Sequence, residues 1–160
     1  MGPQLVLAPL TRAMAEDQAD RLLELINSIP GRSWSRKELL AQRPDKFRYS
    51  RVWLSGIKVL GVVIASRKDE AVHIHQVALD NEYHRRGLGR RAYSEIAGLA
   101  ASEGLSTVTA NCLKSDKGAL DFHLALGFAS VGRYTDPDDG RDYLRLKAAV
   151  ATIVDLGQPE

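Results

Sequence analysis

Apolar residues recur at helical spacing in the N-terminal part of the chain. Residues 4–10 (QLVLAPL) are a short strand candidate, and from Thr11 onward the leucines and isoleucines predict a helix that ends at Pro30. Ser35, with Glu38 three residues later, has the pattern of a capping box and predicts a second, short helix. Two helices are therefore expected after the first strand.

From residue 47 the pattern changes to the composition and alternation of strands. FRYSRVWL (47–54) and VLGVVIAS (59–66) predict a hairpin around Gly56, and AVHIHQVAL (71–79) predicts the next strand. The remaining predicted elements, in chain order, are a helix at 87–103 stopped by Gly104, a strand at 105–110, a helix at 116–126 closed by Gly127, and strands at 128–134 and 142–149.

The predicted order of elements is β-α-α-β-β-β-α-β-α-β-β, with no linker or internal repeat. A chain of 160 residues is about one domain in length, and 44% hydrophobic with 26% charged residues is an ordinary globular composition. We therefore predict a single mixed α/β (α+β) domain over residues 1–152. A loose C-terminal tail is expected at 153–160.

Charge and cysteine content exclude several classes of function. The formal net charge is only +2, which argues against a bulk nucleic-acid binder. The single cysteine, Cys112, cannot form an intramolecular disulfide or a zinc site alone, and we interpret it as a buried thiol rather than a nucleophile. The sequence shows no signal-peptide pattern and no apolar run near the ~20 residues of a membrane span. We expect a cytoplasmic protein.

A glycine-rich stretch, DNEYHRRGLGRRAY (80–93), follows the strand predicted at 71–79. A helix that begins near Gly87 presents backbone N–H groups and partial positive charge, which both favour a phosphate. A side chain at Gly87 or Gly89 would hold the phosphate away from these donors. Four arginines add positive charge: Arg85, Arg86, Arg90 and Arg91. The stretch predicts a phosphate-binding turn; the alternative is the solvated face of a helix start.

Dinucleotide binding is one interpretation of this turn, because Gly87, Gly89 and Ala92 satisfy the pattern G-x-G-x-x-[G/A]. That fold needs an acidic residue about 20 residues later at a strand end, whereas the next predicted strand ends at Ala110-Asn111. Too little chain follows the motif for the remaining strands of a doubly wound sheet. The nucleotide motif GxxxxGK[ST] is absent as well.

The whole chain resembles the GCN5-related N-acetyltransferase (GNAT) superfamily. The acetyl-coenzyme A loop of that family follows the pattern [Q/R]-x-x-G-x-[G/A], and residues 84–89 read HRRGLG, with His84 in place of Gln or Arg. The stretch GALDFHLALGF (118–128) is similar to the family's A-x-x-[F/L]-Y-x-x-x-G-F. Both motifs and the order of elements agree with the family over nearly the full length.

The resemblance implies a mixed, mostly antiparallel central sheet with helices on both faces. It implies an enzyme, an acyltransferase that uses acetyl-coenzyme A and releases coenzyme A. Backbone groups of Val77, Ala78 and Leu79 would bind the pantetheine arm, at a point where neighbouring strands splay apart. The residues that would hold the pyrophosphate are Arg85, Arg86, Gly87, Leu88, Gly89 and Arg90.

Acetyl transfer to a primary amine needs a base, because neutralising an amine of pKa ~10.4 at pH 7 costs roughly 4 to 5 kcal/mol. Alternation along the strand at 71–79 places His73 and His75 on one face with Val77 and Leu79. Histidine, with an unperturbed pKa near ~6.5, can accept a proton at pH 7. The resemblance places the base, commonly a glutamate, at His73 or His75. We favour His75, which is closer to the expected end of the pantetheine.

The coenzyme A thiolate must gain a proton as it leaves. In the family this acid is often a tyrosine in the helix before the GF pair, and the matching residue is His123. The alternative for each histidine is a hydrogen-bonded packing residue. Two histidines at i and i+2 with one distant histidine give a weak metal signal, so we expect no metal site.

The acceptor is the least defined part of the prediction. By the resemblance, residues 29–43, with Trp34, and the loop YTDPDDGRDY (134–143) flank the acceptor cleft, although DPDDG is also a good turn sequence. Three classes remain: a small-molecule amine N-acetyltransferase, a protein or peptide N-acetyltransferase, and a non-catalytic acyl-coenzyme A binding regulatory domain. We favour the small-molecule amine as partner, because no recognition module is appended. We expect no nucleic acid and no membrane as partner, and a homodimer stays open.

Overall fold

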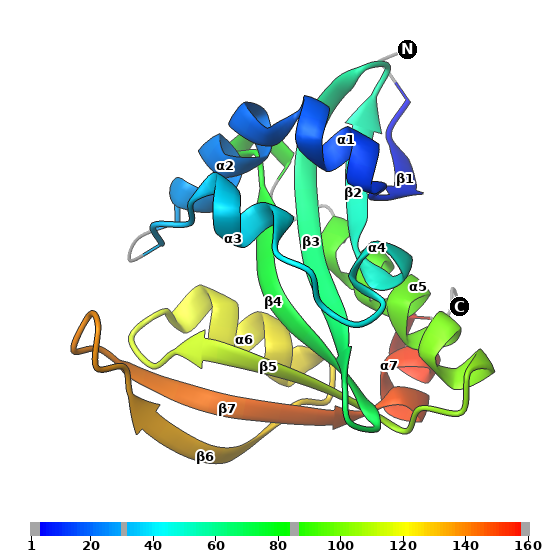
Figure 1. Cartoon of the computed structure of the whole chain (residues 1–160). Coiled ribbons are helices and arrows are strands. Elements are labelled where there is room, and N and C mark those ends of the chain that lie inside the picture. The colour runs from blue at the N-terminus through cyan, green and yellow to red at the C-terminus, as the bar shows by residue number, and fades with distance from the viewer. Residues whose placement is uncertain (1–3, 30–31, 84–86, 158–160) are drawn as a thin grey trace. The chain divides into compact units, whose positions relative to one another are not determined.

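A computed structural model describes residues 4–29, 32–83 and 87–157 of the chain (Figure 1). Its strands are hydrogen-bonded in the order β1-β2-β3-β4-β5-β7-β6. The chain divides into two compact units, one of residues 1–67 with 75–92 and one of residues 68–74 with 93–160. Each unit is described below by itself.

The first unit holds the N-terminal strands. These are β1 (Val6–Pro9), β2 (Arg51–Ser55), most of β3 (Lys58–Lys68) and the C-terminal half of β4 (Ala71–Leu79). β1 pairs antiparallel with β2, and β2 with β3. The predicted hairpin around Gly56 is confirmed: its φ of 61° is a left-handed conformation that suits glycine at the turn.

Four helices connect β1 to β2: α1 (Arg12–Asp17), α2 (Ala19–Asn27), α3 (Arg36–Leu40) and α4 (Lys46–Tyr49). The single first helix of the prediction is two helices, because the chain leaves helical geometry at Gln18. The capping box of α3 is present as predicted, with Ser35 and Glu38 each accepting the other's backbone N–H. Apolar side chains of α1, α2 and α3 pack with Val52, Val62 and other strand residues in one buried core.

Helix α4 corrects the strand predicted from residue 47. Phe47 to Tyr49 are helical, and the strand begins only at Arg51. The reason is visible at Lys46, whose buried ammonium donates to the backbone carbonyls of Leu39 and Ala41 at the C-terminal end of α3. Burial, with nearby arginines, lowers the pKa of Lys46 to about 8.

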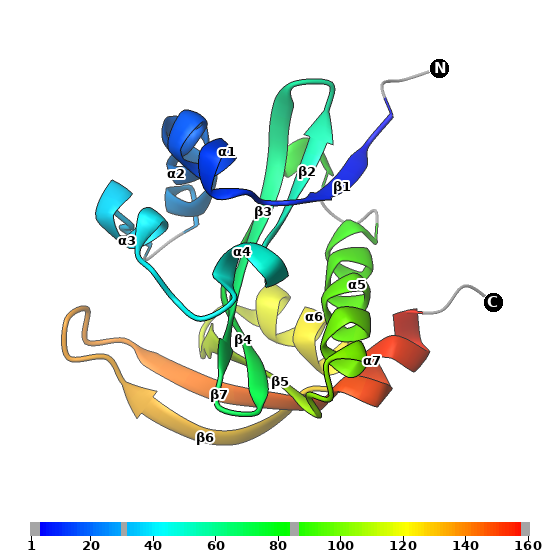
Figure 2. The ribbon, with the colours of Figure 1, turned by 45° about the vertical axis from the view of Figure 1, so that its right-hand side comes forward.

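Both faces of the sheet in this unit carry helices. Val52 points into the core beneath α1, α2 and α3, so alternation turns Trp53 to the opposite face. There the guanidinium of Arg91, on the helix α5 (Leu88–Ser102), lies 6.0 Å from the centre of the Trp53 ring. Helices α1, α2 and α3 are seen on one side of β2 and β3 in Figures 1 and 2.

The second unit holds the other end of the sheet, β5 (Thr107–Leu113), β6 (Ala129–Thr135) and β7 (Asp142–Ala149). The first half of β4 pairs parallel with β5, from Ala71 opposite Thr107 onward. β7 lies antiparallel between β5 and β6. Only β4 and β5 run parallel among these pairs and the antiparallel pairs of the first unit, so the predicted mixed, mostly antiparallel α/β fold is confirmed.

Two helices complete the second unit, α6 (Lys117–Ala125) and α7 (Val150–Gly157). Helix α6 lies along β5 in both views (Figures 1 and 2). Helix α7 crosses the domain boundary predicted at residue 152. Its first turns bury Val150 and Ile153, and this apolar anchorage makes residues 153–157 helical where a loose tail was expected.

Candidate functional site

The C-terminal half of β4 alternates between buried and half-buried residues. Ile74, Gln76 and Ala78 are buried, whereas His75, Val77 and the other odd-numbered residues are half-buried. The half-buried residues His75, Val77 and Leu79 therefore alternate with buried residues along this half of the strand. The buried face carries one polar group without a hydrogen-bond partner among the described residues, the side-chain oxygen of Gln76.

His75 is oriented by a neighbouring strand. The Nε2 atom of its imidazole lies 2.7 Å from the hydroxyl oxygen of Ser66 on β3. Ser66 is itself buried. A hydroxyl can donate to or accept from an imidazole nitrogen, so this contact fixes the ring plane in either tautomer. His75 and the expected pantetheine-binding residues Val77, Ala78 and Leu79 all belong to the first unit.

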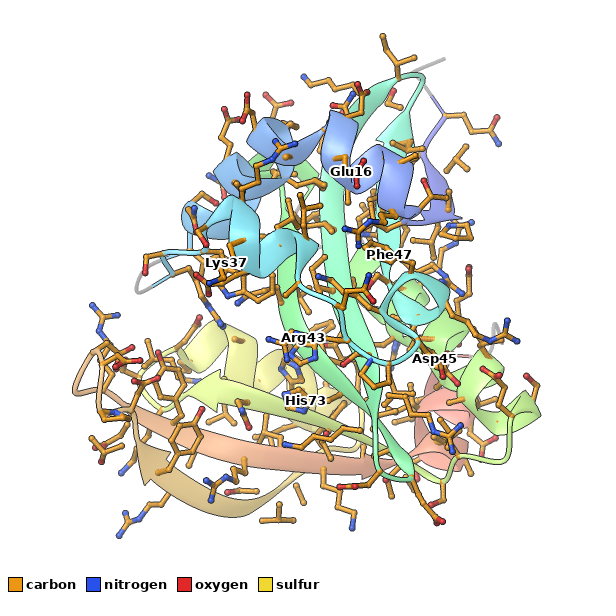
Figure 3. The ribbon with its side chains drawn as sticks, in the orientation of Figure 1. Glu16, Lys37, Arg43, Asp45, Phe47 and His73 are labelled. Atoms are coloured by element: carbon orange, nitrogen blue, oxygen red, sulfur yellow. The ribbon has the colours of Figure 1, made fainter. Side chains whose placement is uncertain are left out.

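His73 has a separate partner in the second unit. Its Nδ1 atom lies 2.8 Å from the hydroxyl oxygen of Thr109, which is directly opposite on the parallel neighbour β5. Figure 3 labels His73 on β4. The two histidines of the strand are thus each held by a hydroxyl from a different neighbouring strand.

His123 on α6 is enclosed more completely. Tyr93, Phe122 and Phe128 surround the ring edge-to-face, with ring centres between 5.1 and 5.5 Å away. Its Nδ1 atom lies 2.7 Å from the carbonyl oxygen of Ala119 and must donate there, because a carbonyl only accepts. A neutral ring therefore accepts at Nε2 from the Tyr93 hydroxyl, 2.8 Å away. Burial lowers the pKa of His123.

The glycine-rich turn is described from Gly87 onward. Gly87 has a φ of +73°, and a Cβ added to it would meet no atom of the described residues within 4 Å. Leu88, Gly89 and Arg90 form the first turn of α5. The predicted phosphate ligands Arg85 and Arg86, and the atypical His84, lie outside the described residues.

The end of β4 is packed tightly on its other neighbour. A Cβ added at Gly61 of β3 would lie 2.5 Å from a ring carbon of Trp53 and 2.6 Å from a methyl carbon of Leu79. It would also lie 3.1 Å from the carbonyl oxygen of Ala78. Glycine is required here by close approach, and the contact involves two of the three residues whose backbone is expected to bind the pantetheine.

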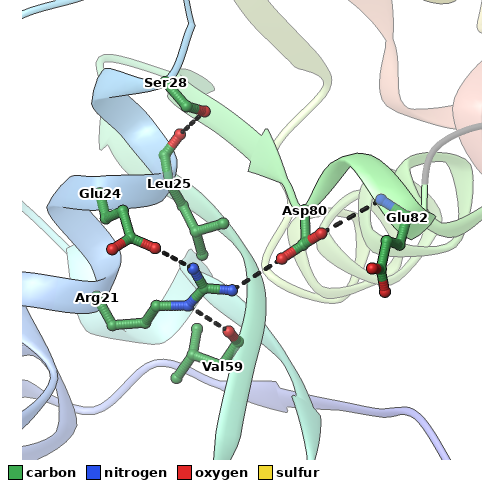
Figure 4. A network of polar contacts seen from close by, with 7 residues as sticks. All are labelled: Arg21, Glu24, Leu25, Ser28, Val59, Asp80 and Glu82. Atoms are coloured by element: carbon green, nitrogen blue, oxygen red, sulfur yellow. Dashed lines mark hydrogen bonds and ion pairs between the residues drawn. The ribbon is translucent and has the colours of Figure 1, made fainter.

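A polar network lies directly after β4 (Figure 4). The guanidinium of Arg21 on α2 donates to a carboxylate oxygen of Asp80 at 3.0 Å and to the carbonyl oxygen of Val59 at 2.9 Å. It also pairs with Glu24 one turn later. The Asp80 carboxylate in turn accepts the backbone N–H of Glu82 at 3.2 Å.

The residues expected around the acceptor are engaged structurally. Trp34 is half-buried against the core, and its backbone N–H and carbonyl both bond to the side chain of Asn27. In the 136–141 loop, side chains of Asp136 and Asp139 accept backbone N–H groups within the loop, which supports the turn interpretation. Lys37 on α3 and Arg43 after it are exposed basic side chains (Figure 3).

Sequence reasoning missed the partners of the three histidines. Ser66, Thr109 and Tyr93 are distant in sequence and reach the histidines only through strand register and helix packing. The link between Arg21 and Asp80 was missed for the same reason. Among the described residues, no group of three or more His, Cys, Asp or Glu side chains is placed to hold a metal ion.

The family of the chain is decided by a match to a family model. The model described as "Acetyltransferase (GNAT) family" matches residues 19–128. The chain belongs to the GNAT acetyltransferase family. It is therefore an acyltransferase, and acetyl-coenzyme A is its cosubstrate. Gly87, with free space at its Cβ position and α5 beginning at the next residue, is where the phosphates of such a ligand are expected.

Solved structures agree on the fold. The ribosomal-protein-S18-alanine N-acetyltransferase of Escherichia coli matches with a TM-score of 0.76 at 16% identity, over 92% of this chain and 94% of that one. Naa50 of Arabidopsis thaliana, solved with a bisubstrate analogue, matches with 0.72 at 12% identity, over 89% and 97%. A chimera of spermidine N-acetyltransferase from Vibrio cholerae and hSSAT matches with 0.70 at 13% identity, over 95% and 99%.

These GNAT structures include enzymes named for protein and for small-molecule substrates. A comparison with curated proteins finds no match. None of the helices in the described part of the chain is long and apolar enough to span a membrane.

Proposed function

We propose that this GNAT protein transfers the acetyl group of acetyl-coenzyme A to the primary amine of a small molecule by direct attack. The amine nitrogen attacks the thioester carbonyl carbon, a C–N bond forms, and the C–S bond breaks. The amine loses a proton to a base, and the coenzyme A thiolate receives one. The observation that carries the proposal is the half-buried position of His75 on β4, two residues before Val77.

His75 is the proposed base. It lies on the same strand and in the same unit as Val77 and Leu79, whose strand end is the proposed pantetheine site. Its contact with Ser66 holds the ring in one orientation. Oriented general bases contribute typically about 100- to 10,000-fold to a rate, so loss of this residue should be readily measured. His73, bonded to Thr109, is the alternative base.

His123 is the proposed acid, and its surroundings set a condition on that role. Nε2 of the neutral ring accepts from Tyr93, so the ring must be protonated before it can donate a proton. Burial, which lowers the pKa of His123, makes the protonated ring scarce at neutral pH. A thiolate with a parent pKa of ~8.5 is a tolerable leaving group without an acid. The acid step therefore contributes less than the base step.

The cofactor placement has a direct test at Gly87. Gly87→Glu adds a carboxylate where the proposed phosphate lies and should abolish binding of coenzyme A in calorimetry. Because the left-handed φ of +73° also strains any side chain, Gly87→Asn is the matched control, since asparagine tolerates this conformation. Equal losses in both variants would show that backbone strain, rather than charge, causes the defect.

A peptide N-terminus is the second candidate acceptor. It is supported by neighbours in the fold whose names include protein substrates and by the Naa50 structure, whose bisubstrate analogue carries the peptide sequence MVNAL. An N-terminal amine has an unperturbed pKa near ~7.7, so a peptide substrate would depend less on a base than a small aliphatic amine does.

The deciding experiment follows free thiol release from acetyl-coenzyme A with panels of small amines and of short peptides. The proposal predicts turnover with at least one class of aliphatic small amine above the rate without acceptor. Turnover with free peptide N-termini alone would select the second candidate. Binding of acetyl-coenzyme A with hydrolysis only, across both panels, would contradict the proposed transfer to an amine.

A further inference from the structure

The guanidinium of Arg21 reaches acceptors in three different parts of the chain. Its Nε donates to the Val59 carbonyl on β3, one Nη donates to Asp80 after β4, and the other Nη pairs with Glu24 on its own helix (Figure 4). The planar guanidinium presents these donors in a fixed fork, which a lysine cannot reproduce. The side chain is about three-quarters buried, with 24% of its surface exposed.

Asp80 is held from several sides. One carboxylate oxygen accepts from Arg21, the other accepts the N–H of Glu82, and its backbone bonds to Leu60 and Tyr83. Together these bonds close the short 3₁₀ turn at Asn81–Tyr83. The hydrogen bond from Arg21 is the main reason that the pKa of the Asp80 carboxyl is lowered.

This arrangement differs from an ordinary surface ion pair, which contributes little to stability. Arg12 and Glu16 form such a pair on α1, with about half of each side chain exposed. The carboxylate of Asp80 instead immediately follows Leu79, the last residue of the strand proposed to bind pantetheine. Any movement of Asp80 is therefore passed directly to that strand end.

We propose that Arg21 is a positioning residue for coenzyme A: by fixing Asp80, it holds the end of β4 and the following turn in the conformation that binds the cofactor. The inference rests on the proposed placement of the cofactor along Val77–Leu79 and Gly87. Arg21 itself does not touch the reacting atoms in this account. In the proposed role it acts through Asp80, while its bond to the Val59 carbonyl anchors the guanidinium on β3.

The test is a double-mutant cycle on the full chain. Arg21→Lys keeps the charge but loses the fork, and Asp80→Asn keeps the shape but loses the charge. We expect either change to reduce the binding-competent population to about one tenth. The Kd for coenzyme A, measured by calorimetry, should then rise about tenfold. Both substitutions break the same link between Arg21 and Asp80. The double variant should therefore bind coenzyme A about as tightly as the weaker-binding of the two single variants.

Hydrogen exchange gives a readout that does not depend on the cofactor. The backbone N–H of Glu82 donates a hydrogen bond to the Asp80 carboxylate. This amide should exchange faster in Arg21→Lys than in the parent, while amides of the core strand β3 keep their protection. If Arg21→Lys does not fold, Asp80→Asn carries the same two measurements. Once acetyl-coenzyme A is saturating, kcat and the KM for the amine should stay within about twofold of the parent, because Arg21 does not take part in chemistry.

Two controls separate this role from general loss of charge. Glu24→Gln removes the exposed partner of the same arginine, and Arg12→Ala removes the exposed pair on α1; both should leave the Kd within about twofold of the parent. If Arg21→Lys and Asp80→Asn bind coenzyme A with the affinity of the parent, the inference is overturned. It is also overturned if the two control variants lose as much affinity as these two. No coenzyme A binding in the parent would refute the cofactor placement and the inference together.

Discussion

His75 and His123 are the same residue type in opposite surroundings. His75 stands on the half-buried face of a strand, with a serine hydroxyl orienting its ring. His123 is only 7% exposed, lies among three aromatic rings, and is bonded through both nitrogens. A general base must gain charge during turnover, and desolvation opposes that charge far more strongly at His123 than on an accessible face.

A residue's position in a family motif therefore does not by itself show that its surroundings allow proton transfer. Both histidines stand where the resemblance to the GNAT family expects catalytic residues, yet His75 is half-buried on a strand whereas His123 is enclosed among aromatic rings. His123 carries packing and hydrogen-bond roles in the aromatic cluster whether or not it also serves as an acid.

Turnover should show the largest difference between the two sites. His75→Ala should lower kcat by about 100- to 10,000-fold, the usual contribution of a general base. His123→Ala should lower kcat of the folded enzyme by less than about tenfold, because a thiol of pKa ~8.5 leaves readily as thiolate. Thiol release at saturating substrates measures both values. Losses of similar size in the two variants would remove the distinction drawn here.

Stability should show the reverse order. His123→Ala opens a cavity among aromatic rings and removes the hydrogen bond to the Tyr93 hydroxyl, which together cost about 3 kcal/mol of unfolding free energy. His75→Ala, on a half-buried face, should cost less than about 1 kcal/mol. Thermal unfolding compares them, and a lower melting temperature for His75→Ala than for His123→Ala would contradict the assigned environments.

Two glycines sharpen the comparison with smaller effects. Gly61→Ala places a Cβ 2.5 Å from Trp53, and Gly127→Ala places one 2.5 Å from Thr152, so each should destabilise by about 1–3 kcal/mol. Only Gly61 also contacts Leu79 and Ala78 at the proposed pantetheine site. Gly61→Ala should therefore weaken coenzyme A binding as well, whereas Gly127→Ala should not. Calorimetry on the folded variants decides this, and equal affinities would separate Gly61 from the cofactor site.

The smallest expected effect is on the pH dependence of stability. Burial lowers the pKa of His123, so below its unfolded value of ~6.5 the unfolded chain binds a proton more readily and stability falls. The contribution is fully present above this pH and is lost as pH falls through the folded pKa. His123→Phe fills the same aromatic space without a titrating group. Denaturant unfolding from pH 7.5 to 5 should give a shallower decline in this variant than in the parent; parallel curves would show that His123 does not contribute.

The elements that depend on local signals were predictable from sequence. The strand at 71–79, the capping box at Ser35, the hairpin at Gly56 and the helix stops at Gly104 and Gly127 all follow from short-range pattern and from glycine's access to positive φ. The face of β4 that carries the histidines was equally readable from strand alternation.

What sequence could not give is the set of long-range partners. Helix α4 forms because Lys46 satisfies carbonyls at the end of α3, and α7 forms because Ile153 is buried; neither has a local signature. The hydroxyl partners of His73 and His75 depend on which residues the neighbouring strands bring opposite them. Such register is fixed by packing rather than by the strand's own sequence.

The most direct test of the central claim is the pH profile of kcat for the parent and for His75→Ala with one accepted amine. The account predicts that the parent's rate rises with an apparent pKa in the histidine range, near ~6.5. It also predicts that the variant loses this limb while its Kd for coenzyme A stays within about twofold of the parent. A variant that keeps both the parental rate and the parental limb would contradict the assignment of His75 as the base.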